Sequence, residues 1–198
     1  MLDLGAPLPE SLLAAELLEG DGSPVTVRDL VAPGPTLLVF LRHFGCVGCS
    51  LQVSHLAPRA HELAELGVRS VYVGSGNPAQ RDGFVERLGL GDKPVTLVCD
   101  PALGAYGAAD MHRSLWSAIE PRAVGHQLRA YGQGFQGGWG IQGDNNQQGG
   151  ALLLDAELRV AYARYARFTA DLVDGSDVVA AATKLRLKTH TDEGGYLL

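Results

Sequence analysis

Apolar runs of strand length recur along most of this 198-residue chain. Residues 36–41 form an almost entirely apolar run, which is typical of a β-strand buried on both faces. Shorter apolar runs and one hairpin pattern predict further strands at residues 24–27, 68–73, 95–99, 151–154 and 160–163. We therefore expect the strand at residues 36–41 to be central in a sheet.

Helical stripes separate these strands. Apolar residues spaced three or four apart, together with helix-start signals, predict helices over residues 49–66, 78–88, from about 101 onward, and 178–187. Pro58 is expected to kink the first of these helices or to split it in two. The order of elements predicts a single α/β domain over residues 1–198, with a mixed sheet and helices on both faces.

A glycine-rich segment interrupts this order between residues 111 and 148. We interpret it as an insertion before the C-terminal hairpin. Residues 114–131 keep enough apolar spacing for a helix or two, whereas residues 132–143 are expected to form a loop near the active-site edge. We expect Phe135 and Trp139 to be the only large apolar anchors of that loop.

The composition indicates a folded chain without a nucleic-acid partner. Hydrophobic residues make up 46% of the chain, which is enough for a core. The net charge is −6 and no cluster of Lys and Arg occurs, so no nucleic acid is expected to bind. No apolar run approaches the ~20 residues of a membrane span, and the N-terminus lacks the pattern of a secretory leader. These features predict no membrane association and a cytoplasmic location.

Two of the three cysteines, Cys46 and Cys49, form a C-x-x-C after the strand at residues 36–41, where the next helix begins. Free N–H groups and the helix dipole at such a start lower a thiol pKa from about 8.5 toward 7 or below. The spacing also lets the two sulfurs close a small ring when oxidised. The element order with this motif resembles the thioredoxin-like fold and predicts no cofactor besides a redox-active Cys46–Cys49 disulfide.

Other interpretations of the cysteines stay open at this point. A C-x-x-C is also half of a zinc site, but Cys99 stands alone in an apolar strand and His43 and His55 could complete a site only by chance, so no metal is expected. Two buried, inert thiols are a further alternative. Cys99 itself is expected to be a core thiol.

Two separated segments carry a family resemblance. Residues 40–49 read FLRHFGCVGC, and residues 143–155 read GDNNQQGGALLLD. Both resemble segments of the peroxiredoxin-like branch of the AhpC/TSA family, the alkyl hydroperoxide reductases and thiol-specific antioxidant proteins. The resemblance of the chain to this branch covers roughly residues 4–187. The resemblance implies a thioredoxin-like fold and an antioxidant oxidoreductase acting on a peroxide. It also implies a thiol electron donor, either a thioredoxin-like protein or glutathione.

The chain departs from typical peroxiredoxins at the site itself. Their Pro-x-x-x-Thr-x-x-Cys pattern places Arg42 at the proline, Cys46 at the threonine and Cys49 at the peroxidatic cysteine. The arginine that the family carries before a later strand is replaced by residues 148–150, Gln-Gly-Gly. The alignment nominates Cys49 as the attacking sulfur, whereas the helix start nominates Cys46. We predict Cys46, because it should be the more exposed of the two.

Further site candidates surround the dithiol in the sequence. Arg42 either stabilises a thiolate or a peroxide oxygen, or is a solvated arginine at the strand end. His43 is interpreted as an exposed or hydrogen-bonded histidine. Gly45, Gly149 and Gly150 are candidate substrate-binding residues, and the last two are expected to let the backbone approach the sulfurs.

Three functions fit these observations. The first is a dithiol oxidoreductase that reduces a peroxide or a related oxidised substrate and is recycled by a thiol donor. The second is a redox-responsive binding protein with little turnover, and the third is a small-ligand binder on the same scaffold. The insertion either caps the site or binds a second copy of the chain, so a homodimer is among the assemblies that the sequence allows.

Overall fold

A seven-stranded mixed sheet forms the centre of the molecule. The computed structural model describes residues 1–32, 34–114, 116, 120–135, 137–138 and 142–194. In spatial order the strands are β2 (Pro24–Thr26), β1 (Glu16–Leu18), β5 (Val95–Cys99), β4 (Arg69–Gly74), β3 (Thr36–Phe40), β6 (Gly150–Leu154) and β7 (Val160–Tyr165). β3, β4 and β5 are parallel, and the other neighbouring pairs are antiparallel.

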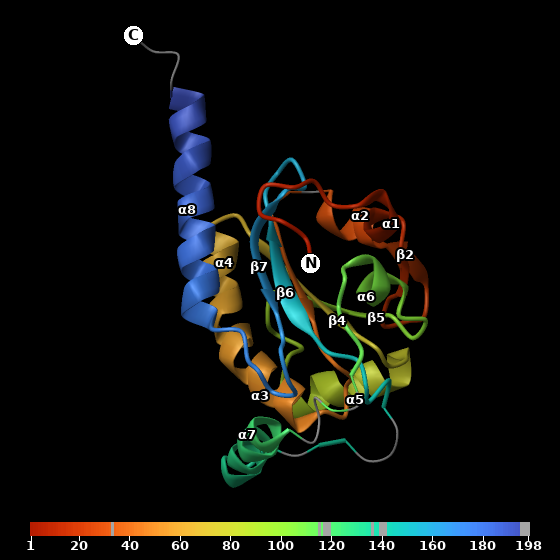
Figure 1. Cartoon of the computed structure of the whole chain (residues 1–198). Coiled ribbons are helices and arrows are strands. Elements are labelled where there is room, and N and C mark those ends of the chain that lie inside the picture. The colour runs from red at the N-terminus through yellow and green to blue at the C-terminus, as the bar shows by residue number, and fades with distance from the viewer. Residues whose placement is uncertain (33, 115, 117–119, 136, 139–141, 195–198) are drawn as a thin grey trace.

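Helices cover both faces of the sheet, as Figure 1 shows. One face carries α3 (Val47–Leu56), α4 (Ala60–Glu65), α5 (Pro78–Leu88) and α8 (Gly175–Gly194). The opposite face carries α1 (Glu10–Leu13), α2 (Val27–Val31) and α6 (Gly104–Ala108). α7 (Pro121–Gly132) lies beyond the sheet, against α3. No helix in the described part of the chain is long and apolar enough to cross a membrane.

Both faces of β3 are buried, which explains its apolar sequence. Leu37 and Val39 contribute to the core shared with α3, α4, α5 and α8. Leu38 and Phe40 point to the other core, beneath α1, α2 and α6. β3 has β4 on one side and β6 on the other, so the loop that follows it opens near the middle of the sheet.

Most of the predicted elements are confirmed. The strands lie within a few residues of their expected positions, and α5 covers residues 78–88 as predicted. Pro58 splits the first long helix: α3 ends at Leu56, a 3-10 turn follows at Ala57–Arg59, and α4 begins directly after it at Ala60. α3 begins at Val47 rather than at Cys49.

Short elements near the N-terminus and the length of the last helix differ from the prediction. α1, β1 and α2 were not expected. β1 has only three residues, too few for a periodic pattern. α2 begins at Val27, the last residue of the strand predicted at residues 24–27, because Thr26 and Asp29 form a capping box. α8 spans Gly175–Gly194 and so extends beyond residues 178–187 on both sides.

Among the described residues of the insertion, α7 lies where helix was predicted and ends one residue beyond that region, at Gly132. The described residues of the following loop contain no regular strand. Phe135 packs with Val47 and Leu51 of α3, so this anchor lies next to the dithiol helix as predicted. Trp139 lies outside the described residues.

Candidate active site

The dithiol occupies the junction between β3 and α3. Cys46 is the N-cap of α3 and Cys49 lies in its first turn, which confirms that the C-x-x-C lies where this helix begins. Cys46, Cys49 and Cys99 are free thiols. The predicted contrast in exposure is wrong, because Cys46 is 6% exposed and Cys49 is 5% exposed. Burial therefore does not distinguish the two sulfurs, and their partners must do so.

The loop that leads to the dithiol is held at every carbonyl. The carbonyls of residues 41–46 accept, in chain order, from Tyr106 Oη, Ser75 Oγ, Cys46 N–H, the Arg87 guanidinium, Gly138 N–H and Ser50 N–H. Several of these donors come from distant segments of the chain. The path of the loop, and with it the position of both sulfurs, is fixed by tertiary contacts rather than by local sequence.

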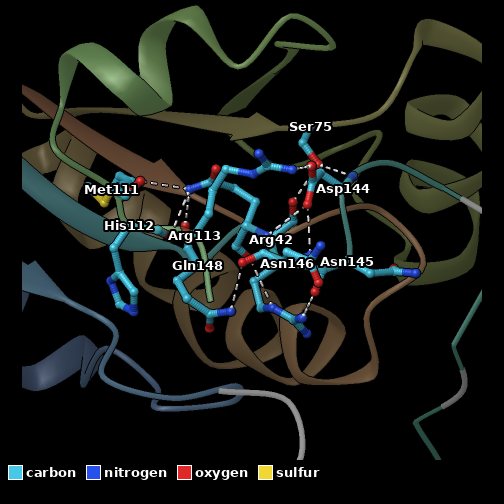
Figure 2. Close-up of polar contacts among 10 residues, drawn as sticks. Arg42, Ser75, Met111, His112, Arg113, Asp144, Asn145, Asn146 and Gln148 are labelled. Carbon is cyan, nitrogen blue, oxygen red and sulfur yellow. Dashed lines mark hydrogen bonds and ion pairs between the residues drawn. The ribbon is translucent and has the colours of Figure 1, made fainter. Parts of the chain in front are cut away.

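Arg42 brings its positive charge to the dithiol. Its Nη1 lies 3.4 Å from Cys46 Sγ, and its backbone N–H donates to Cys49 Sγ at 3.1 Å. The rest of the guanidinium donates to backbone carbonyls, from Nε to Gln147 at 3.0 Å and from Nη2 to Asn145. Arg42 is only 8% exposed, so the solvated alternative is wrong. Figure 2 shows the guanidinium among residues 144–148.

The two thiols differ in the direction of their pKa shifts. A hydrogen bond from the Cys49 thiol and the charge of Arg42 lower the pKa of Cys46 well below its ordinary value, although burial opposes them. Donating that hydrogen bond, together with burial, raises the pKa of Cys49 well above its ordinary value. This arrangement favours a thiolate at Cys46 and a protonated thiol at Cys49.

His43 is neither exposed nor fully hydrogen-bonded, contrary to expectation. Its Nδ1 is buried and has no hydrogen-bond partner among the described residues. Burial lowers the pKa of His43, although the nearby Cys46 opposes that shift. A neutral imidazole at neutral pH leaves Arg42 as the stable positive charge beside the dithiol.

A segment that the sequence did not single out covers the dithiol. We call residues 166–173, which follow β7, the cover. The cover and the dithiol loop line a partly open cavity of about 40 Å³. Its lining includes Arg42, Cys46 and Cys49 on one side and Ala166, Phe168 and Ala170 on the other. Because one water needs roughly 10–15 Å³ measured in this way, the cavity has room for a molecule as small as hydrogen peroxide.

The cover is anchored to α3 by one side-chain amide. Gln52 Nε2 donates to the Val173 carbonyl at 3.0 Å, and Val173 N–H donates to Gln52 Oε1 at 2.5 Å. Gly48 lies directly beneath the cover, where a Cβ atom would stand 2.8 Å from Ala170 Cβ. The x-x positions of the C-x-x-C thus include a glycine because the cover packs on it.

Gly149 and Gly150 allow neighbouring strands of backbone to approach closely. A Cβ on Gly149 would lie 2.1 Å from the Phe40 carbonyl oxygen, and one on Gly150 would lie 2.5 Å from that of Arg164. Both glycines line the cavity together with Cys46 and Cys49, so the predicted approach of their backbone to the sulfurs stays a prediction. Gly45 lies against the insertion, since its carbonyl accepts from Gly138 N–H at 3.1 Å.

Cys99 lies apart from this chemistry. It is fully buried in the core, as predicted, and burial raises its pKa to about 11. Within the described residues, no group of three or more His, Cys, Asp or Glu side chains has the arrangement of a metal site.

Family comparison places more than half of the chain in one known group. A family model described as AhpC/TSA antioxidant enzyme matches residues 55–167. The matched region begins after the dithiol and includes residues 143–150. Among the described residues it thus covers the segment that holds the Arg42 guanidinium.

Curated relatives share about a quarter of the aligned sequence. Thioredoxin-like protein AAED1, chloroplastic, from Arabidopsis thaliana is 26% identical over 76% of this chain and 62% of its own length. Peroxiredoxin-like 2C from Bos taurus is 26% identical over 75% of this chain and 68% of its own length. Prostamide/prostaglandin F synthase from Salmo salar is 28% identical over 67% of this chain and 66% of its own length. The chain thus spans about two thirds of the length of these relatives.

Solved structures share the fold over nearly the whole chain. Peroxidoxin BcpB from Mycobacterium tuberculosis has a TM-score of 0.64 at 16% identity, covering 94% of this chain and 98% of its own. Peroxiredoxin Q from Xanthomonas campestris has a TM-score of 0.63 at 18% identity, with the same coverage. At such identities the likeness establishes the peroxiredoxin type of thioredoxin-like fold.

Proposed function

Because the chain belongs to the AhpC/TSA antioxidant enzyme family, we propose that it is a thiol peroxidase that uses Cys46 and Cys49. Cys46 is the attacking sulfur and Cys49 the resolving one. The observation that carries this assignment is the 3.4 Å contact between Arg42 Nη1 and Cys46 Sγ. A guanidinium at that distance stabilises a thiolate and also faces the oxygen atoms of a peroxide that enters the cavity.

The proposed first step is attack of the Cys46 thiolate on one peroxide oxygen. The S–O bond forms as the O–O bond breaks, so the sulfur is oxidised to a sulfenic acid and the substrate is reduced. The leaving oxygen takes a proton and departs as water or an alcohol. Arg42 stabilises the negative charge that passes from the sulfur to that oxygen.

The second step forms a disulfide between the two cysteines. The Cys49 sulfur attacks the sulfur of the Cys46 sulfenic acid, an S–S bond forms, and the hydroxyl leaves with a proton as water. A thiol donor, either a thioredoxin-like protein or glutathione, then supplies two electrons and two protons to restore both thiols. The redox-active disulfide is therefore the only redox group that the proposal requires.

The cavity favours a small peroxide. Its volume of about 40 Å³ admits hydrogen peroxide without rearrangement. A larger hydroperoxide would need the cover to move. A cytoplasmic location stays a prediction of the sequence, and the relative from Arabidopsis thaliana is described as chloroplastic.

The test compares single cysteine variants of the reduced protein in stopped-flow reactions with hydrogen peroxide. We expect Cys49→Ser to consume one equivalent and stop at a sulfenic acid, which a dimedone adduct at residue 46 would identify. Cys46→Ser should not react on that timescale, and Cys99→Ser, a matched buried thiol, should behave like the unmodified chain. Rapid oxidation in Cys46→Ser with none in Cys49→Ser would instead assign the attack to Cys49. Slow oxidation of every variant would favour a redox-responsive or ligand-binding protein.

A further inference from the structure

Two backbone carbonyls set the direction of the Arg42 side chain. We call residues 143–148 the bracket, because its carbonyls at Asn145 and Gln147 accept from Nη2 and Nε of Arg42. A guanidinium is planar, so fixing these two nitrogens also fixes the third. The third, Nη1, is the one that lies 3.4 Å from Cys46 Sγ. The shape of the bracket therefore determines where the charge of Arg42 points.

The carboxylate of Asp144 folds the bracket. Its Oδ1 accepts from Asn146 N–H at 2.7 Å and from Gln147 N–H at 3.1 Å, which closes the turn that presents the two carbonyls. Its own N–H donates to Ser75 Oγ at 2.9 Å, and that hydroxyl donates to the Arg42 carbonyl at 2.6 Å. Figure 2 shows this circuit from Asp144 to both ends of Arg42.

We propose that Asp144 is a positioning residue, which aims Arg42 at Cys46 by holding the bracket in its folded turn. The inference rests on the proposed role of Cys46 as the attacking thiolate. Asp144 acts only through Arg42. Without its carboxylate the carbonyls of Asn145 and Gln147 lose their fixed positions, and Nη1 is no longer directed at the sulfur.

The sign of the effect separates positioning from direct electrostatics. A carboxylate is negative, so its charge alone disfavours a nearby thiolate, and removing it would lower the pKa of Cys46. Loss of the positioned guanidinium has the opposite effect and raises that pKa. A variant without the Asp144 carboxylate therefore gives opposite answers under the two explanations.

The experiment is a titration of the reduced protein, following the ultraviolet absorbance of the Cys46 thiolate with Cys46→Ser as the blank. Asp144→Ala should shift the titration to higher pH by about one unit, so that the thiolate population at lower pH falls about tenfold. Asp144→Asn keeps an oxygen that accepts from the same N–H groups and should titrate at or slightly below the position of the unmodified chain. Ser75→Ala, which removes the link to Arg42 by another route, should shift in the same direction as Asp144→Ala.

The chain offers a matched control at Asp155. Its Oδ1 also accepts from two backbone N–H groups, those of Glu157 and Arg159, in the turn between β6 and β7. Asp155→Ala should leave the Cys46 titration unchanged, and so should Arg113→Ala, which removes only the exposed ion-pair partner of Asp144.

Three results would overturn the inference: no shift in folded Asp144→Ala, a shift to lower pH, or equal upward shifts in Asp144→Ala and Asp144→Asn. If Asp144→Ala does not fold, Ser75→Ala decides in the same way. The titration measures ionisation and not turnover. A protein that fails to reduce peroxides but shows the expected shifts would refute the proposed function and leave the positioning role intact.

Discussion

The bracket and the cover form two walls of the same site, yet they are built in opposite ways. The bracket is polar: its backbone carbonyls hold Arg42 through hydrogen bonds, and the Asp144 carboxylate accepts from backbone N–H groups of the bracket itself. The cover presents mainly apolar side chains to the cavity, among them Phe168, Ala170 and Leu172. The bracket therefore sets the charge near the sulfur, whereas the cover gives the cavity an apolar lining.

Mutations should also affect the bracket and the cover differently. In the polar bracket, displacement of one acceptor is enough to weaken the interaction of Arg42 with the sulfur, because the energy of that interaction depends on the distance between the charges. In the apolar cover, weaker packing or anchoring opens the cavity by degrees. Changes in the bracket should therefore alter the ionisation of Cys46, and changes in the cover should alter which molecules reach it.

The largest effect should follow removal of the charge itself. Arg42→Ala is expected to slow oxidation of Cys46 by hydrogen peroxide by about tenfold to a hundredfold at neutral pH, because the thiolate loses its cation. Arg42→Lys keeps a positive charge but lacks the planar fork that the bracket holds, so it should recover only part of the rate. Stopped-flow rates across pH provide the measurement.

The pH profile of the oxidation rate shows in which direction Arg42 shifts the pKa of Cys46. The pKa of Cys46 is lowered in the folded chain, so the rate should stay constant above that pKa and fall as pH drops through it. In Arg42→Ala this fall should occur at higher pH. An unchanged profile would mean that Arg42 does not stabilise the thiolate.

A smaller effect should follow release of the cover. Gln52→Leu removes both hydrogen bonds to Val173 while keeping a side chain of similar size, and should cost about 1–3 kcal/mol at this anchor. Hydrogen exchange of residues 166–173 should become faster. Reaction with a bulky alkyl hydroperoxide should accelerate several-fold relative to hydrogen peroxide. If that ratio does not change, the cover does not select by size.

The smallest effect is expected from one added methyl group. Gly48→Ala places a Cβ 2.8 Å from Ala170 Cβ, so the cover must shift, at a cost of about 1–2 kcal/mol. Gly83→Ala is the matched control, because Gly83 lies within α5 with nothing within 4 Å of the added atom. The control should stabilise the protein by about 0.5–1 kcal/mol. Denaturant unfolding of both variants measures the difference, and equal changes would contradict the packing of the cover on Gly48.

Local sequence determined the elements that carry the dithiol. The apolar run of β3 indicates burial on both faces, and the C-x-x-C that follows it marks the start of α3. Pro58 determined where the long helix divides, since a proline in the interior of a helix removes a hydrogen bond and clashes with the preceding turn. The three residues of β1 escaped prediction because a strand that short is defined by its neighbours.

The tertiary structure decided the chemistry of the two sulfurs. Cys46 and Cys49 are almost equally buried, so the helix start alone could not rank them. Their difference comes first from the hydrogen bond that the Cys49 thiol donates to Cys46, and then from the charge of Arg42. The direction of Arg42 is set by carbonyls 103 and 105 residues further along the chain. The Gly-Asp-x-x-Gln segment was recognised in the sequence only as a resemblance. The hydrogen bonds from Arg42 to this segment join residues that are far apart in the sequence, and so does the packing of the cover on α3. No local sequence pattern encodes contacts of this kind.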